Sequence, residues 1–328
     1  MNNIQKSLCQ NVENDYTPIF GWVMKEDKDV FLPTTSAHTC RFCGKTEPEV
    51  TFLKRAHAVS ELCGNHHLLS ECECDDCNGK FSKFEKEFSQ MMLFLHTMLQ
   101  VKGKKNNPKF QPDRNGKSYI EIVDGQINIH QYDGEDPLVT IDEKNQEARL
   151  NGVRNYIPID AYKCLIKMAL TVMPERELDN LQDILTFLNT GERLPVKPMC
   201  HLRIYNAFNA HKYPAAFIYK RKETCTKQLP AYLFALAYND FFFQMVIPSM
   251  KLDERLEGVS RIDLPVIPSI CDGEYRIIYR EYLDLSSDIK QMKQSIPLNM
   301  KFDGYKMEDY LTGEVKEIPP SKDWSNQS

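Results

Sequence analysis

The stretch CRFCGKTEPEVTFLKRAHAVSELCGNHHLLSECECDDCNGKFSKFE, residues 40–85, decides the fold of the first part of this chain. Two Cys-x-x-Cys pairs, Cys40/Cys43 and Cys74/Cys77, enclose a segment that contains His57. Four thiolates in such pairs are typical of a closed tetrahedral zinc site, which leaves a nearby histidine free for chemistry. We therefore predict a structural Zn²⁺ on these four cysteines. The run ECEC leaves Cys72 as an alternative to Cys74.

Composition restricts the class of protein. The 328 residues allow two or three domains, and a net charge of −5 means that any nucleic-acid binding depends on local patches. Six of the 11 cysteines fall within residues 40–77, which favours bound metal in a reducing compartment over a disulfide framework. The first residues show no signal-peptide pattern, so we expect a cytoplasmic location. The most apolar window, 231–250, has Asn239-Asp240 at its centre, which indicates two buried strands joined by a turn and no membrane span.

The local patterns around the cysteines predict two strands and a helix. β-Branched and aromatic residues favour strands over 30–35 and 49–59, the second of which ends near His57. Apolar residues at helical spacing favour an amphipathic helix over 79–100: Phe81, Phe84, Phe88, Met91 and Leu95. We read this order as a ββα module clamped by zinc, within residues 1–100.

Residues 101–117 are rich in lysine, asparagine and proline, and we interpret them as a basic linker. Beyond them, Asp124-Gly125 between alternating residues is typical of a tight hairpin. Asp160 is a candidate cap for a helix over 161–173, and a second helix follows over 174–190. Runs after Cys200 favour strands of a mainly antiparallel sheet. The predicted fold class is α+β: the zinc-stapled ββα module, a larger α+β domain over 118–315 for recognition or regulation, and a polar tail over 316–328.

The segment 40–88 resembles the zinc-ribbon-supported subgroup of the HNH endonuclease family. That pattern is written roughly C-x-x-C-G, A/E-H-x-x-P-E-x-x-G-N and E-C-D-x-C-N-x-x-F-x-x-x-E. This chain supplies, in the same order, CRFCG, AHAVSELCGN and ECDDCNGKFSKFE. The similarity covers about a seventh of the sequence. Cysteine pairs alone occur in many zinc ribbons. The histidine between the pairs and the terminal Cys-Asn reduce the number of zinc-ribbon families that the segment resembles.

The resemblance implies residue roles. His57 matches the general base, and a neutral imidazole suits that task because its pKa lies near the working pH. Asn78 matches a ligand of a catalytic Mg²⁺ or Mn²⁺, since its amide oxygen is a hard donor, although asparagine is also an effective helix cap. Asn65 stands where the family has an asparagine that pins a loop. Glu85, two helical turns beyond Asn78, is a further candidate ligand, or else part of a solvated helix face.

The chain departs from the family pattern at two positions. Many members carry a metal-binding Asp or His immediately before the base, where this chain has Ala56. We therefore expect the missing ligand to come from elsewhere, with Glu85, His66 and His67 as candidates. Ser60 stands where relatives often have proline, which changes the stiffness of the loop more than its chemistry.

The expected function is metal-dependent hydrolysis of DNA, with double-stranded DNA as the expected substrate. By analogy with the family, the expected context is bacterial defence or a mobile element. The basic segments 101–117 and 219–227 are candidates for phosphate contact. A solvated connector explains the first equally well, and a solvated hairpin end is the favoured interpretation of the second. The resemblance also allows a homodimer, and a protein partner or activator bound by the larger domain. Two alternatives stay open: a non-catalytic zinc-binding interaction module, and a nuclease that acts on RNA.

Overall fold

The computed structural model describes residues 1–25, 28–102, 107–113, 115–191, 194, 196–256, 259, 262–294, 298–302, 304–309 and 311–318. The chain divides into two compact units: residues 1–108 with 156–291, and residues 109–155 with 292–328. This division differs from the expected boundary at 101–117, because the first hundred residues share a unit with the long sheet of the later chain. Residues 103–106 and 114 of the expected linker, and 319–328 of the expected tail, lie outside the described residues.

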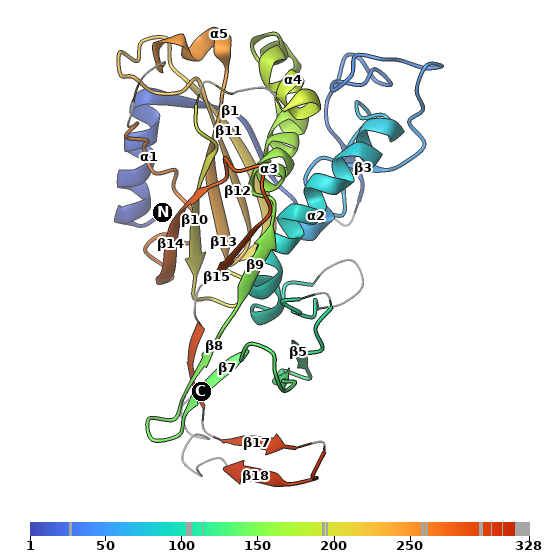
Figure 1. Ribbon diagram of the computed structural model, residues 1–328. Helices are drawn as coiled ribbons and strands as arrows, with labels where there is room; N and C mark the ends of the chain where they lie inside the picture. The colour runs from blue at the N-terminus through green and yellow to red at the C-terminus, as the bar shows by residue number, and fades with distance from the viewer. Residues whose placement is uncertain are drawn as a thin grey trace. The chain divides into compact units, whose positions relative to one another are not determined.

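The larger unit is built on a six-stranded antiparallel sheet (Figure 1). Its strands, in spatial order, are β1 (Tyr16–Val23), β11 (His211–Arg221), β12 (Tyr232–Asn239), β13 (Phe241–Ile247), β10 (Met199–Tyr205) and β14 (Ile277–Asp284). The predicted turn is confirmed: Tyr238 pairs with Phe241, and Asn239 takes a φ of 47° between them. The prediction of a mainly antiparallel sheet is confirmed as well.

Both faces of this sheet are covered, which explains the continuous apolar sequence of β12 and β13. In Figure 1, α1 (Asn3–Asp15) lies on one side of the sheet, and α2 (Asp75–Met98) and α3 (Pro158–Val172) lie on the other. On the α1 side, Val12 packs in a cluster with Leu233 and Phe242. On the other side, the ring of Phe88 lies 5.7 Å from that of Phe243. Within the described part of the chain, no helix has the length and apolarity needed to cross a membrane.

The helices predicted over 79–100 and 161–173 are found, but each begins earlier than predicted, and α1 was not predicted. The five predicted apolar residues of α2 are all buried, but the helix begins at Asp75 and so includes Cys77 and Asn78. α3 begins with Pro158 at its first position, which places Asp160 inside the first turn, so the predicted Asp160 cap is wrong. The second predicted helix is split into the 3₁₀ helix η2 (Glu175–Asn180) and α4 (Gln182–Thr190), and Gly191 ends it with a φ of 80°.

The segment between the cysteine pairs has little regular structure. β2 (Val30–Phe31), β4 (Leu68–Ser70) and β3 (Ala56–His57) form a small sheet, and the 3₁₀ helix η1 (Glu61–Cys63) lies between β3 and β4. The predicted strand over 49–59 is therefore wrong outside Ala56–His57. The backbone amides of Leu53 and Lys54 donate instead to the Asp75 carboxylate at the start of α2, at 3.0 and 2.7 Å. They are therefore not available to pair with another strand.

The smaller unit is a set of short antiparallel pairs. β5 (Tyr119–Val123) and β6 (Gln126–His130) form the predicted hairpin, with positive φ at Asp124 and Gly125. β7 (Val139–Asp142), β8 (Glu147–Leu150) and β16 (Leu298–Lys301) form a second sheet, and β17 (Tyr305–Glu308) pairs with β18 (Val315–Ile318). β9 (Val153–Tyr156) pairs with β15 (Gln291–Gln294). The short elements α5 (Met250–Asp253) and η3 (Glu254–Leu256) belong to the larger unit.

Candidate metal centre and adjoining pocket

Four thiols converge as the sequence predicted. The sulfurs of Cys40, Cys43, Cys74 and Cys77 all lie within 4.8 Å of one another, and those of Cys43 and Cys74 are 3.8 Å apart. Four ligands at the usual Zn–S distance in a tetrahedron have sulfurs about 3.8 Å apart. The group could therefore hold a metal ion such as zinc. Gly44, with a φ of 73°, makes the tight turn behind the first pair, and its amide donates to the carbonyl of Cys40 at 2.7 Å.

The choice between Cys72 and Cys74 is decided by geometry. Cys72 points its thiol at the Thr34 hydroxyl, 3.1 Å away, whereas Cys74 faces the other three sulfurs. A hydrogen bond from Cys77, helped by nearby backbone amides, lowers the pKa of the Cys40 thiol to about 4. A thiolate is the form that binds a metal, so Cys40 is the thiol best prepared for one. Burial raises the pKa of Cys74 to about 11, and the hydrogen bond with Cys40 raises the pKa of Cys77.

Arg41, inside the first cysteine pair, fixes this knuckle to the body of the unit. Its Nη1 donates to the carbonyls of Leu170, Thr171 and Met173, at 2.7, 2.7 and 3.1 Å. These carbonyls belong to the last turn and end of α3, where backbone acceptors lack helical partners and a cation is favoured. Sequence reasoning missed this contact, since the acceptors lie about 130 residues away.

A pocket of about 270 Å³ lies in the same unit and brings together several predicted residues. Its wall includes His57 from β3, and Asn78 and Glu85 from α2. The same wall also holds residues that the sequence did not single out, namely Lys54, Arg55, Glu61, Glu73, Cys164, Lys167 and Met168. The pocket therefore combines an imidazole, hard oxygen donors and cations. That combination can bind a phosphate together with a divalent ion.

His57 is held largely out of solvent. Its Nδ1 is buried and has no hydrogen-bond partner among the described residues, and its Nε2 lies 3.7 Å from Oε1 of Glu61. Burial lowers the pKa of His57, and the nearby cations Arg55 and Lys167 act in the same direction, while the carboxylate of Glu61 opposes them. The imidazole is consequently neutral at pH 7, which is the state that can accept a proton.

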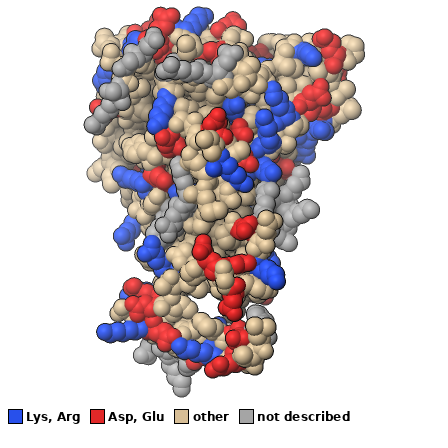
Figure 2. Space-filling view, viewed as in Figure 1, with Lys and Arg blue, Asp and Glu red and all other residues tan. Residues whose placement is uncertain are grey.

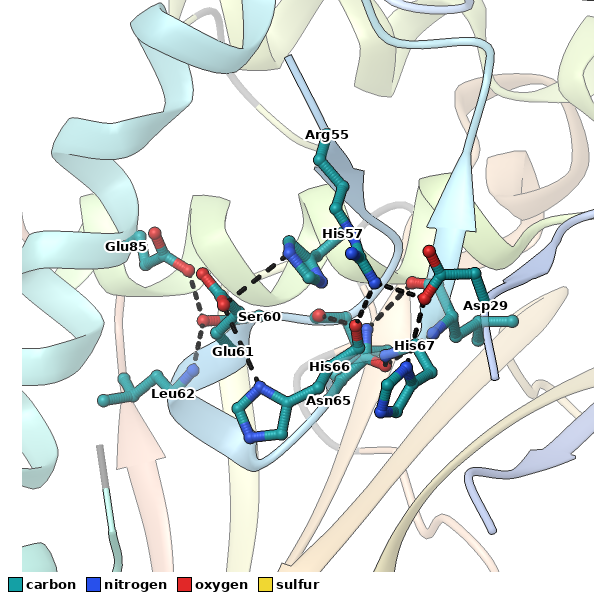
Figure 3. A network of polar contacts seen from close by, with 12 residues as sticks. Asp29, Arg55, His57, Ser60, Glu61, Leu62, Asn65, His66, His67 and Glu85 are labelled. Atoms are coloured by element: carbon teal, nitrogen blue, oxygen red, sulfur yellow. Dashed lines mark hydrogen bonds and ion pairs between the residues drawn. The ribbon is translucent and has the colours of Figure 1, made fainter. Parts of the chain in front are cut away.

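Figure 3 shows how Glu61 lies between two imidazoles. Besides its approach to His57, its Oε1 is 3.9 Å from Nδ1 of His66. His67 points elsewhere, because its Nδ1 lies 3.1 Å from a carboxylate oxygen of Asp29, which also pairs with Arg55. Of the two histidines considered as alternative ligands, His66 therefore lies beside the pocket residue Glu61, whereas His67 is paired with Asp29 and is not part of the pocket wall.

Asn65 is fully buried and bonds only to backbone groups in the structure. Its amide nitrogen donates to the carbonyls of Val59 and Leu68, and its oxygen accepts from the amides of His67 and Leu68, at distances of 2.6–3.2 Å. Asn65 is not part of the pocket wall. It therefore closes the loop between β3 and β4, and so fixes where His57 and Glu61 lie.

Asn78 and Glu85 lie on the pocket side of α2. Asn78 is the fourth residue of the helix, and the cap position is held by Cys74, so the helix-cap alternative for Asn78 is excluded. Glu85 is exposed but accepts a hydrogen bond from the hydroxyl of Ser60, which is buried under it. The serine that replaces the proline of the family pattern thus ties the loop after His57 to α2.

The second basic segment, 219–227, has most of its charge paired within the fold. Lys220 contacts the Glu177 carboxylate at 2.7 Å, Lys227 contacts Asp15 at 2.6 Å, and Arg221 lies 3.5 Å from Asp253. Figure 2 shows basic and acidic side chains interleaved over the visible face.

Comparison with protein-family models finds no match, and comparisons with curated proteins and with solved structures find none either.

Proposed function

We propose that this protein is a metal-dependent endonuclease of the HNH type that hydrolyses DNA phosphodiester bonds. The observation that carries the proposal is the shared pocket: His57 from the second part of the motif, and Asn78 and Glu85 from the third, line one cavity. The order β3, β4, α2, with the two strands antiparallel and the helix starting in the second cysteine pair, supports a ββα module.

His57 acts as general base in this proposal. It takes a proton from a water molecule, the resulting hydroxide attacks phosphorus, and the bond from phosphorus to the leaving sugar oxygen breaks. The leaving oxygen is then protonated from solvent. Burial of His57 keeps the imidazole unprotonated at neutral pH, and a positioned base contributes about 10²- to 10⁴-fold to such a reaction.

Asn78 and Glu85 would hold the catalytic ion. The donor set fits Mg²⁺ or Mn²⁺, because amide and carboxylate oxygens are the ligands that these ions prefer. Ala56 offers no ligand, and Glu85 is the local replacement. When bound, the ion supplies charge stabilisation on the phosphate.

The four cysteines serve as scaffold in this account. A zinc on Cys40, Cys43, Cys74 and Cys77 ties the knuckle to the first turn of α2, and therefore fixes Asn78, the next residue, relative to the body of the unit. Asn65 positions the loop that carries His57 and Glu61, and touches no reacting group. Lys54 and Arg55 line the pocket and supply contacts for the DNA backbone.

The test is cleavage of supercoiled plasmid, double-stranded oligonucleotide and RNA of matched sequence, each with Mg²⁺, Mn²⁺ or EDTA. The matched control for His57→Ala is His67→Ala, since His67 lies in the same segment, residues 40–88, but outside the pocket. We expect divalent-ion-dependent DNA cleavage that His57→Ala abolishes and His67→Ala preserves. Cleavage of RNA but not of DNA would mean that the substrate is RNA. No cleavage of either nucleic acid would favour the non-catalytic zinc-binding module.

A further inference from the structure

One cation in the pocket wall comes from outside the segment that resembles a nuclease. Lys167 belongs to α3, and its Nζ donates to the backbone carbonyl of His57 at 3.1 Å. The same Nζ lies 2.8 Å from a carboxylate oxygen of Glu73. The Glu73 side chain has no exposed surface and that of Lys167 is 14% exposed, so this ion pair is screened little by solvent.

The two contacts of Lys167 have different consequences. Glu73 directly precedes Cys74, so the ion pair joins α3 to the start of α2. The bond to the carbonyl of His57 joins α3 to β3. Because β3 has only two residues, Ala56 and His57, few ladder hydrogen bonds fix it, and the charge-assisted bond from Lys167 adds to them.

We propose that Lys167 is a positioning residue for His57, which makes α3 part of the catalytic centre and not of a separate recognition domain. This inference rests on the proposed function of His57 as base. The ammonium of Lys167, anchored by Glu73, holds the His57 backbone so that the imidazole keeps its place in the pocket. Cys164 and Met168, also on α3, close the same wall.

The charges around His57 give this proposal a signature beyond stability. Glu61 faces the imidazole from η1, Arg55 from the residues before β3, His66 from the loop before β4, and Lys167 from α3. The other ionisable groups of the pocket wall are Lys54, Glu73, Cys164 and, on α2, Glu85. The positive charge of Lys167 disfavours protonation of His57. Removal of that charge should therefore raise the pKa of His57.

The experiment uses the full-length, zinc-loaded protein and compares Lys167→Met, Lys167→Arg and Lys163→Met. Lys163 is the matched control, because it lies one turn earlier on α3, is nine-tenths buried and packs over the rings of Phe84 and Phe187, away from His57. We expect Lys167→Met to lower kcat for DNA cleavage by about 10- to 100-fold, the range for a misplaced catalytic group, with KM changed much less. Lys163→Met should keep the wild-type kcat, and Lys167→Arg should recover part of the loss.

Two further readouts distinguish positioning from folding and from the proposed function itself. In Lys167→Met the acid limb of the pH profile should move to higher pH, and the same upward shift should appear in an NMR titration of the His57 imidazole, which needs no activity. If Lys167→Met fails to fold because Glu73 is left unpaired, the double variant Lys167→Met/Glu73→Gln removes both charges and is measured instead. A folded Lys167 variant with wild-type kcat and wild-type His57 titration would overturn the proposal. An inactive wild-type protein with a shifted titration would overturn only the nuclease function.

Discussion

Glu61→Gln should shift the pH dependence of the candidate base in a direction that the structure fixes. The carboxylate of Glu61 stabilises protonated His57, so its removal lowers the pKa of His57 further. Oε1 of Glu61 and Nε2 of His57 are 3.7 Å apart. At the dielectric constant of water, two charges at that distance interact by about 1 kcal/mol, which corresponds to about 0.8 of a pH unit. Both side chains are largely buried, so we take this shift as a minimum.

The assay is the pH profile of single-turnover DNA cleavage in low salt, for wild type, Glu61→Gln and the control Glu49→Gln. Glu49 is exposed and lies outside the pocket. The sign follows from the role of the base: a lower pKa keeps His57 unprotonated at lower pH, so the acid limb of the profile moves down by about 0.8 pH unit or more. An acid limb that stays in place or moves to higher pH in Glu61→Gln would refute the reasoning about this pair.

Three predictions concern folding. Cys77→Ser should lose the metal and destabilise the larger unit at the same time, because metal binding and folding are linked. Metal analysis and a thermal melt of the same sample measure both effects. A metal-free wild-type protein with a normal melting transition would contradict this prediction. Asn65→Ala removes four buried backbone bonds and should cost about 3 kcal/mol or more in a denaturant titration. Burial lowers the pKa of His96 to about 3, so below about pH 6.5 only the unfolded chain binds a proton there, and the free energy of unfolding falls as the pH drops. His96 should account for about 2 kcal/mol of that fall between pH 7.5 and 5. In denaturant titrations, the free energy of unfolding of His96→Gln should fall by about 2 kcal/mol less than that of the wild type over the same range.

Local patterns predicted the features that depend on neighbours in the sequence. Three such features are found in the structure: the paired cysteines, the Asp124-Gly125 turn and the apolar stripe from Phe81 to Leu95. Each depends on the conformation of residues that are close in the sequence. The helix start at Asp75 was missed because its stabilising contacts, the amides of Leu53 and Lys54, come from a preceding loop.

Features that depend on distant residues could not be read from the sequence. β1 gives little local signal, and it is a strand because β11, nearly 200 residues away, pairs with it. The same holds for Arg41 and Lys167, whose acceptors become neighbours only after folding. One signal was available: Lys163 and Lys167 interrupt an otherwise apolar helix, and a lysine in such a position needs a partner or a route to solvent.

The most direct test of the central claim, that His57 is the base of a nuclease pocket, is the single-turnover rate of DNA cleavage by His57→Ala at saturating Mg²⁺ or Mn²⁺. The metal content and melting temperature of the variant are measured alongside, so that the rate is compared only between folded, metal-loaded proteins. We predict a rate at least about 100-fold below that of the wild type, the lower end for loss of a general base. A folded, metal-loaded His57→Ala that cleaves DNA at the wild-type rate would contradict the account.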